Sequence, residues 1–219
     1  MPNFKPEEIG KLLQPYLMEE AAWQHQRPEL LDRLSRYLDL LVLWNGRMNL
    51  TAVRDPRAIV RRHFGESLFA ARRVSGTGTL LDLGSGAGFP GLPIQLWHPH
   101  LRVTLAESQL KKSAFLREAI RSLSLSTEVF AGRAEQMKPS RSFDTVVLRS
   151  VDRSRDALES ALRLSAGDVW LLGSRAAGAM PIGGGRVVEE FPLPKGALTS
   201  LFRIERDSST WNRVEKPAK

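Results

Sequence analysis

The chain has 219 residues, 42% of them hydrophobic and 26% charged, which is typical of a folded globular domain with a sizeable core. It contains no cysteine, so disulfides, thiolate metal sites and the thiolate attack that usually precedes methylation of pyrimidine carbon 5 are excluded. The formal net charge of +8 favours a polyanionic partner, although a solvated basic surface accounts for it equally well.

The first part of the chain is expected to be helical. Leucines and a tyrosine recur at helical spacing over residues 28–44, and Asn45-Gly46 is expected to end that helix because both residues tolerate positive φ. Asp55-Pro56 is expected to open a second helix, with Asp55 as its N-cap, that runs to about residue 73. We therefore predict a helical extension over residues 1–76.

Beyond residue 77 the pattern changes to alternating strands and helices, which calls for a parallel sheet covered on both faces. Two later apolar runs with no helix between them are expected to add an antiparallel hairpin at the sheet edge, and the glycine-rich segment 176–185 is interpreted as a mobile loop. We predict an α/β fold over residues 77–219: a Rossmann-like, seven-stranded, mostly parallel sheet with helices on both faces, packed with the extension as one globular unit. The expected strands are 79–83, 101–106, 128–131, 143–148, 169–173, 186–191 and 201–206, and the expected helices are 92–97, 111–123 and 156–164.

The turn after the first of these strands carries the strongest chemical signal. The apolar run ends in a carboxylate, and closely spaced glycines follow directly before a helix. Glycines let a ligand approach the backbone, and a helix N-terminus offers free N–H groups, so we expect a nucleotide-like cofactor here rather than a plain tight turn. The residues concerned are Asp82, Gly84, Gly86, Gly88 and Gly91.

Two classes of cofactor fit this turn. Gly86-x-Gly88-x-x-Gly91 matches the dinucleotide pattern of an NAD-dependent oxidoreductase, and Glu107 lies about 20 residues on, as that pattern asks. However, this match leaves Asp82 and Gly84 unexplained, and Pro90 removes an N–H that a pyrophosphate could use. The longer pattern Asp-x-Gly-x-Gly-x-Gly is similar to the first motif of S-adenosylmethionine methyltransferases, and we prefer that interpretation.

Three further positions follow the ends of predicted strands. Glu107 ends the second strand, where it could accept both hydroxyls of a ribose or remain a solvated glutamate. Arg133-Ala134-Glu135 follows the third strand, near the expected path of an adenine, although a surface Arg–Glu pair explains the triplet equally well. Arg149 ends the fourth strand, where it could contact the cofactor or an incoming base, or form an ion pair with Asp152.

Six short segments stand in a fixed order between about residues 33 and 151. They are Trp44-Asn45-x-x-x-Asn49-Leu50-Thr51, Arg62-His63-x-x-Glu66-Ser67-Leu68, Asp82-x-Gly84-Ser85-Gly86-x-Gly88-x-Pro90-Gly91, Glu107-Ser108-x-x-Lys111-Lys112-x-x-Phe115-Leu116, Arg133-x-Glu135 and Phe143-Asp144-x-x-x-x-Arg149. In this order they resemble the RsmG family, also called GidB, and jointly they are far more specific than any one of them. The chain departs from the family at position 66, where glutamate replaces the usual aspartate, and at Ser150, where alanine is common.

The resemblance implies an activity and a set of residues. Members of the family methylate N7 of a guanine in 16S ribosomal RNA near the decoding centre, so a class I methyltransferase with S-adenosylmethionine as cofactor is implied. Guanine N7 has a lone pair and no proton, so an in-line displacement would need alignment rather than a general base, with Arg149 positioning the reactants. With the glycine turn, the resemblance implies cofactor contacts from Asp82, Gly84, Gly86, Gly88, Phe89, Glu107 (the ribose acid), Ala134, Glu135 and Arg149.

The implied partner is 16S ribosomal RNA or the small ribosomal subunit. Basic side chains of the second helix and near the cofactor are expected to contact phosphates, although a solvated helix face explains any one of them about as well. His63 could touch the substrate, but a histidine beside Glu66 and Ser67 is more typical of a structural hydrogen bond. The predicted RNA-binding residues are Arg54, Arg57, Arg61, Arg62, His63, Lys111 and Lys112.

We expect a cytoplasmic monomer that binds no metal and no membrane. No apolar run approaches the roughly 20 residues needed to cross a bilayer, and the first ten residues lack an export signal. Alternative functions are a methyltransferase that acts on another RNA, a protein or a small molecule, and a non-catalytic RNA-binding assembly factor on the same fold.

Overall fold

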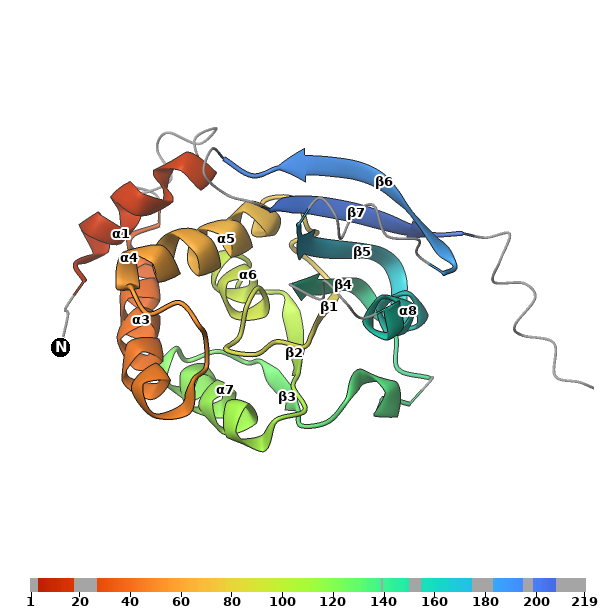
Figure 1. Ribbon diagram of the computed structural model, residues 1–219, viewed down its shortest axis with the longest axis horizontal. Helices are drawn as coiled ribbons and strands as arrows, with labels where there is room; N and C mark the ends of the chain where they lie inside the picture. The colour runs from red at the N-terminus through yellow and green to blue at the C-terminus, as the bar shows by residue number, and fades with distance from the viewer. Residues whose placement is uncertain are drawn as a thin grey trace, which may run out of the picture.

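The computed structural model describes residues 4–17, 27–138, 140–149, 155–174, 183–194 and 199–207. Its centre is a seven-stranded sheet with the order β3-β2-β1-β4-β5-β7-β6 (Figure 1). Strands β1 to β5 are parallel to one another, and β7 runs antiparallel to both β5 and β6. The strands are β1 (Thr79–Leu83), β2 (Arg102–Ala106), β3 (Glu128–Phe130), β4 (Phe143–Arg149), β5 (Ser165–Gly173), β6 (Gly185–Pro192) and β7 (Ser200–Arg206).

The predicted Rossmann-like, mostly parallel sheet is confirmed. Its central strands are apolar runs because both of their faces are covered, as in β1, where Leu80 and Leu81 are fully buried on successive positions. The terminal hairpin is also confirmed, with Phe202 paired to both Leu171 and Glu190. Strand β5 begins at Ser165, four residues before the predicted start, and most of the predicted loop 176–185 lies outside the described residues.

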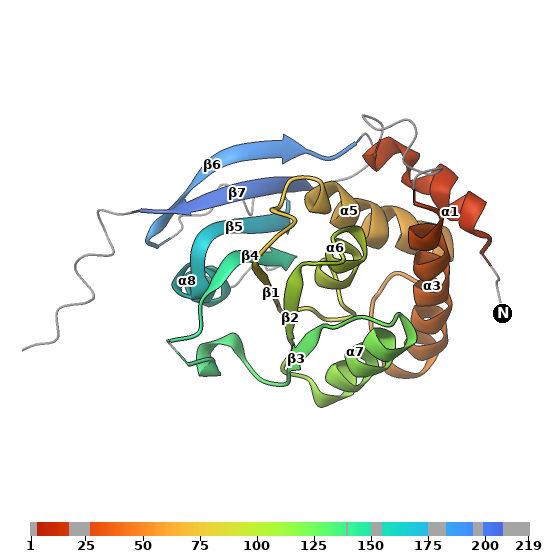
Figure 2. The ribbon, with the colours of Figure 1, turned by 180° about the vertical axis from the view of Figure 1, so that it is seen from behind.

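Helices cover both faces of the sheet (Figures 1 and 2). Helix α6 packs against β1 and β2, and α7 packs against β3, on the face that the N-terminal helices also cover, whereas α8 packs against β4 and β5 on the other face. The helices are α1 (Pro6–Leu13), α3 (Pro28–Met48), α4 (Pro56–Ile59), α5 (Glu66–Ala71), α6 (Gly91–Trp97), α7 (Leu110–Ser122) and α8 (Arg155–Leu164), with shorter turns η1 (Gln14–Tyr16), η2 (Val60–Gly65) and η3 (Ala134–Gln136).

The predicted end of the first long helix is wrong. Helix α3 continues through Asn45 and Gly46 to Met48, and the left-handed residue that ends it is Asn49, with φ of 50°. Asn45 stays helical because its side chain is occupied elsewhere: it is buried and bonds the loop that follows. The second predicted helix is confirmed as the continuous run α4–η2–α5, with Asp55 as N-cap accepting from the N–H groups of Arg57 and Ala58, and with a π-helical stretch at η2.

One buried apolar cluster joins the N-terminal helices to the sheet. It contains Ile9 of α1 and Leu34 of α3 together with Leu80 of β1 and Val147 of β4. Tyr37 is at its centre, with its ring 5.2 Å from that of Phe64, 5.3 Å from that of Phe89 and 6.5 Å from that of Phe115. The division into two domains at residue 76 stays a prediction.

Candidate functional site

The glycine turn after β1 is held in one shape from three sides. Asp82 accepts the N–H of Gly91 at 2.9 Å, and the Ser85 hydroxyl donates to the carbonyl of Asp82 at 2.9 Å. From the adjacent strand, the carbonyl of Ala106 accepts the N–H groups of Gly84 and Ser85 at 2.9 and 3.0 Å. The turn is therefore pre-organised rather than shaped by a ligand.

Glycine is required for different reasons at different positions of the turn. A side chain at Gly88, where φ is +91°, would place its Cβ 2.5 Å from the hydroxyl of Tyr37, and one at Gly91 would lie 2.5 Å from Leu105, so packing excludes larger residues there. Gly84 has φ of +74° and nothing within 4 Å of where a Cβ would be, which leaves open space beside the backbone. The ligand-facing part of the turn thus begins at Gly84, the residue that the dinucleotide pattern left unexplained.

Glu107 closes the turn from β2. One of its carboxylate oxygens accepts the N–H of Gly86 at 2.9 Å and the other accepts the N–H of Gln109 at 2.8 Å, while the side chain is only 6% exposed. Each carboxylate oxygen has a second lone pair, so the group can still accept hydroxyl donors. Its fixed orientation at the end of β2 is that of a ribose-binding acid in an open α/β sheet.

The wall opposite the turn is the loop after α3. The Asn45 side chain accepts the N–H of Thr51 at 2.9 Å and donates to the carbonyl of Val53 at 3.3 Å. Arg54 donates to the carbonyl of Asn45 at 3.0 Å and also bonds the side chain of Asn49. The segment Trp44-Asn45-x-x-x-Asn49-Leu50-Thr51 therefore builds one side of a pocket.

Arg149 links that wall to the sheet. Its guanidinium donates to a carboxylate oxygen of Glu66 at 2.8 Å, to Nδ1 of His63 at 2.7 Å and to the carbonyl of Arg62 at 2.9 Å. Thr199, before β7, donates to the other oxygen of Glu66 at 3.3 Å. The Arg149–Glu66 pair is a nearly dry ion pair, since the two side chains are 12% and 4% exposed.

Burial dominates the electrostatics of the site. It raises the pKa of Asp82 to about 7 and raises the pKa of Glu66, where the guanidinium of Arg149 offsets part of the effect. Burial, with Arg149 and Arg62 nearby, lowers the pKa of His63 to about 3, so its imidazole is neutral at physiological pH. The ring of His63 stacks on Phe89, with 4.9 Å between ring centroids.

These elements enclose a pocket of about 400 Å³ between the glycine turn and the loop after α3. Of the predicted site residues it brings together Gly84, Gly86, Phe89, Arg149, Arg62 and His63. Asp82 and Gly88 are buried and do not line the pocket, and Glu107 bonds the N–H of Gly86, which does. The rest of the lining was not predicted as site residues, although Leu50, Thr51 and Ser85 belong to quoted segments. It consists of Leu50, Thr51, Ala52, Val53, Ser85 and Ala87.

Other predicted residues lie outside that lining. Ala134 is buried in η3, where its carbonyl accepts from Arg163 at 3.0 Å, and Glu135 is exposed beside it. Arg61 and Lys111 are exposed, whereas Arg57 approaches Glu8 at 3.7 Å. Contacts of these side chains with a cofactor or RNA stay predictions. The predicted alternative partner of Arg149, Asp152, lies outside the described residues.

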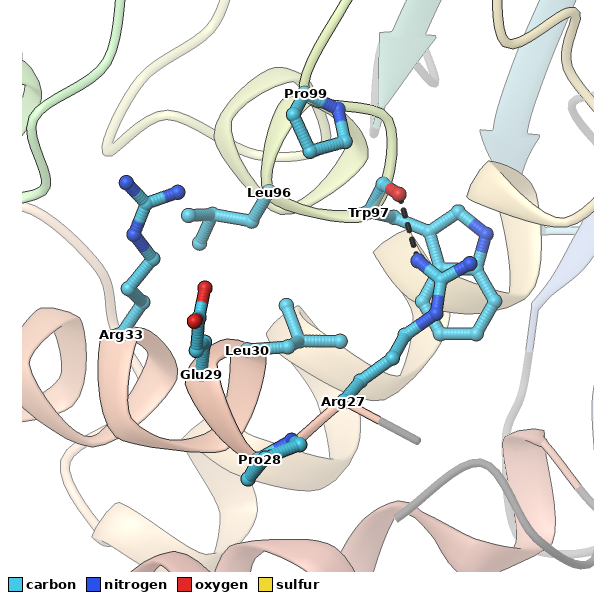
Figure 3. Close-up of a pocket in the computed structure, with 8 residues that line it drawn as sticks. All are labelled: Arg27, Pro28, Glu29, Leu30, Arg33, Leu96, Trp97 and Pro99. Carbon is cyan, nitrogen blue, oxygen red and sulfur yellow. Dashed lines mark hydrogen bonds between the residues drawn. The ribbon is translucent and has the colours of Figure 1, made fainter. Parts of the chain in front are cut away.

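A larger pocket of about 600 Å³ lies at the opposite end of α6 from the glycine turn (Figure 3). There Arg27 stacks on the ring of Trp97 at 4.0 Å and donates to its carbonyl at 2.7 Å, while Glu29 and Arg33 project from the first turns of α3. No strand end or glycine turn reaches this pocket within the described ranges, so it is not the candidate site.

The described part of the chain has neither a membrane-spanning helix nor a cluster of metal-ligating side chains. None of its helices is long and apolar enough to cross a membrane. Its histidine, aspartate and glutamate side chains form no group of three or more that could hold a metal ion.

Comparison with known proteins gives relatives and a fold. The family model GidB, rRNA small subunit methyltransferase G, matches residues 30–176. A ribosomal RNA small subunit methyltransferase G of Nitrosomonas europaea is 43% identical over 140 residues, which is 64% of this chain and 65% of that protein. The protein of the same name from Xanthomonas euvesicatoria pv. vesicatoria is 48% identical over 120 residues, 54% of this chain and 56% of that protein. The chain thus spans between about half and two thirds of the length of these relatives.

Solved structures share the fold at low sequence identity. The mitomycin 7-O-methyltransferase matches with a TM-score of 0.56 and 16% identity over 92% of this chain and 72% of its own. An O-methyltransferase from neocarzinostatin biosynthesis, in complex with S-adenosylmethionine and a hydroxy-methyl naphthoic acid, matches with a TM-score of 0.51 and 17% identity over 63% of this chain and 52% of its own. The architecture is the Rossmann-like methyltransferase fold.

Proposed function

Because this chain belongs to the GidB family, rRNA small subunit methyltransferase G, we propose that it transfers a methyl group from S-adenosylmethionine to N7 of a guanine in 16S ribosomal RNA. The observation that carries the proposal is the pocket that opens over Gly84 and Gly86, with the buried carboxylate of Glu107 bonded to the N–H of Gly86. The partner is 16S RNA, alone or in the small ribosomal subunit.

The residues of the pocket fit this cofactor. Open space at Gly84 admits a ligand against the backbone, and Glu107 retains acceptor capacity for two ribose hydroxyls. Asp82 and Gly88 hold the turn, while Gly86, Phe89 and Arg149 line the space above it. Ala134 and Glu135, which follow β3, would approach the adenine. When bound, S-adenosylmethionine supplies an electrophilic methyl group on a sulfonium centre.

The chain contributes alignment to the reaction. Guanine N7 offers a lone pair and carries no proton, so no base has to remove one. The pocket agrees with this, because Nδ1 of His63 is occupied by Arg149 and its Nε2 lies 2.8 Å from Thr51, which leaves the imidazole no nitrogen for substrate. The rigid walls hold the reactants in near-attack geometry and exclude water. Arg149 is the positioning residue, fixed by three acceptors.

Basic side chains around the pocket would bind the RNA backbone. Arg61 and Arg62 are exposed on η2 and form no ion pair within the residues that the structure describes, so their charges are available to phosphates. Lys111 and Lys112 stand at the start of α7, on the edge of the sheet where β1 and β2 end. Arg54 would act mainly by holding the pocket wall.

A pair of glycine substitutions tests the proposal. Gly84→Ala puts a methyl group into the open space and should abolish both cofactor binding in calorimetry and transfer of labelled methyl to small subunits from cells that lack the family enzyme. Gly184→Ala is the matched control, because Gly184 has φ of +80° and equally open surroundings but lies before β6, away from the pocket. Equal cofactor affinity in the two variants would contradict the proposed site. Cofactor binding without transfer to any RNA would favour a binding protein on this fold.

A further inference from the structure

A chain of hydrogen bonds runs from Arg149 to the pocket with a fixed direction. A guanidinium has five N–H donors and no acceptor, so the 2.7 Å contact between Arg149 and Nδ1 of His63 requires Nδ1 to accept. The neutral imidazole therefore carries its proton on Nε2. Glu66 anchors the start of the chain, because it holds the guanidinium at 2.8 Å.

The next link reaches Thr51. Nε2 of His63 lies 2.8 Å from the hydroxyl oxygen of Thr51, and with its proton there it donates to that oxygen. Stacking on Phe89 fixes the plane of the imidazole, so the direction of this bond is fixed as well. Burial keeps the pKa of His63 at about 3, so protonation does not reverse the chain at physiological pH.

The only hydrogen-bonding capacity left to the Thr51 hydroxyl is its own hydrogen. The N–H of Val53 also donates to its hydroxyl oxygen, at 3.2 Å, so both lone pairs of that oxygen are used. The remaining hydrogen of the hydroxyl has no acceptor among the described residues, and the half-buried side chain lines the pocket. An arrangement of this kind cannot act as a nucleophile activated by His63, because the histidine donates to the hydroxyl instead of accepting from it.

We propose that Thr51 selects the target base by donating a hydrogen bond to a carbonyl oxygen beside the attacking nitrogen. This inference rests on the proposed function and adds the group that recognises the base. In guanine, O6 is such an acceptor and stands next to N7 on the same edge, whereas adenine has an amino donor in that place. A second donor facing the Thr51 hydroxyl would leave both groups unpaired, so the site rejects adenine. Polarisation along the chain from Arg149 makes the hydroxyl a better donor.

The test combines two base analogues with two variants. Small-subunit RNA is prepared with guanine or with 2-aminopurine, which keeps N7 and lacks O6, at the methylated position. We expect wild type and Thr51→Ser to prefer guanine, and Thr51→Val, which keeps the shape and loses the hydroxyl, to react about tenfold more slowly with guanine. Thr51→Val should also show a guanine preference about tenfold smaller than that of wild type. The intrinsic difference in reactivity between the two bases cancels in this comparison.

An unchanged guanine preference in Thr51→Val, with normal cofactor affinity in calorimetry, would overturn the role of Thr51 and leave the proposed function standing. Failure of wild type to methylate guanine N7 in any form of the RNA would overturn the proposed function itself. A readout independent of activity is the ¹⁵N spectrum of the imidazoles, with His63 assigned by its loss in His63→Gln. A signal from an unprotonated Nδ1 and a protonated Nε2 between pH 5 and pH 8 would support the inference, and a proton on Nδ1 instead would contradict it.

Discussion

Removing the carboxylate of Glu66 should be the most damaging single change in the pocket wall. In Glu66→Ala the guanidinium of Arg149, whose side chain is 12% exposed, would lose its ion-pair partner and keep only the weaker attraction of the buried Asp82. Thr199 would lose its 3.3 Å acceptor at the same time. Glu66 is only 3% exposed, so water cannot easily replace the lost carboxylate.

The expected size follows from the burial of the pair. Breaking a buried ion pair by deleting one partner costs about 3–5 kcal/mol, because an uncompensated charge remains in a region of low dielectric constant. For a chain of 219 residues each kcal/mol shifts the melting temperature by about 2–4 °C, so a drop on the order of 10 °C is expected. Urea titration and thermal melting, followed by circular dichroism, measure both quantities.

The matched control is Glu118→Ala, which breaks the exposed Glu118–Arg121 pair with side chains 31% and 77% exposed. Exposed pairs contribute about 0–1 kcal/mol, so this variant should unfold almost as wild type does. In the double variant Glu66→Ala/Arg149→Met the buried charge is gone, and part of the lost stability should return. Equal unfolding free energies for Glu66→Ala and Glu118→Ala would refute the reasoning.

The remaining predictions concern the cofactor, the RNA and pH. Glu107→Ala should raise the cofactor dissociation constant at least tenfold, since two hydroxyl contacts and the anchor of Gly86 are lost, and an unchanged constant in calorimetry would remove the ribose assignment. Arg61→Ala/Arg62→Ala should weaken RNA binding in a filter assay and reduce the slope of its logarithmic salt dependence by about 1.4–1.8. The matched pair Arg33→Ala/Arg36→Ala, near the N-terminus of α3, should leave that slope unchanged. Because the folded-state pKa of Asp82 is raised to about 7, its proton stabilises the fold below about pH 4, and this contribution is lost as the pH rises through 7. The unfolding free energy of wild type should therefore fall relative to that of Asp82→Asn by up to about 4 kcal/mol between pH 4 and pH 8, and parallel pH profiles would show that Asp82 titrates normally.

Local sequence patterns predicted those elements of the fold that nearby residues determine. The strand over residues 79–83 and the cap formed by Asp55 are set by neighbours within a few positions, and the structure has both. The predicted end of α3 was wrong because a local pattern was not sufficient there. Asn45 and Gly46 are residue types typical of a helix end, but the Asn45 side chain bonds the following loop at Thr51 and Val53. Only the folded loop reveals that requirement.

The sequence predicted the residues of the site more fully than the contacts between them. The glycine turn and Glu107 directly follow β1 and β2, where strand ends and glycines make a pattern that the sequence shows directly. The partner of Arg149 is Glu66, 83 positions away in the chain, and no spacing rule connects them. The pocket wall at Thr51 depends in turn on that contact through His63, so its role as a donor became visible only in three dimensions.

The most direct test of the account is to locate the transferred methyl group. Purified protein is incubated with methyl-labelled S-adenosylmethionine and small ribosomal subunits from cells that lack the family enzyme, and the labelled nucleosides of the 16S RNA are then identified. The account predicts label in 7-methylguanosine at a single position. Label in another nucleoside, or none from a protein that binds the cofactor, would contradict it.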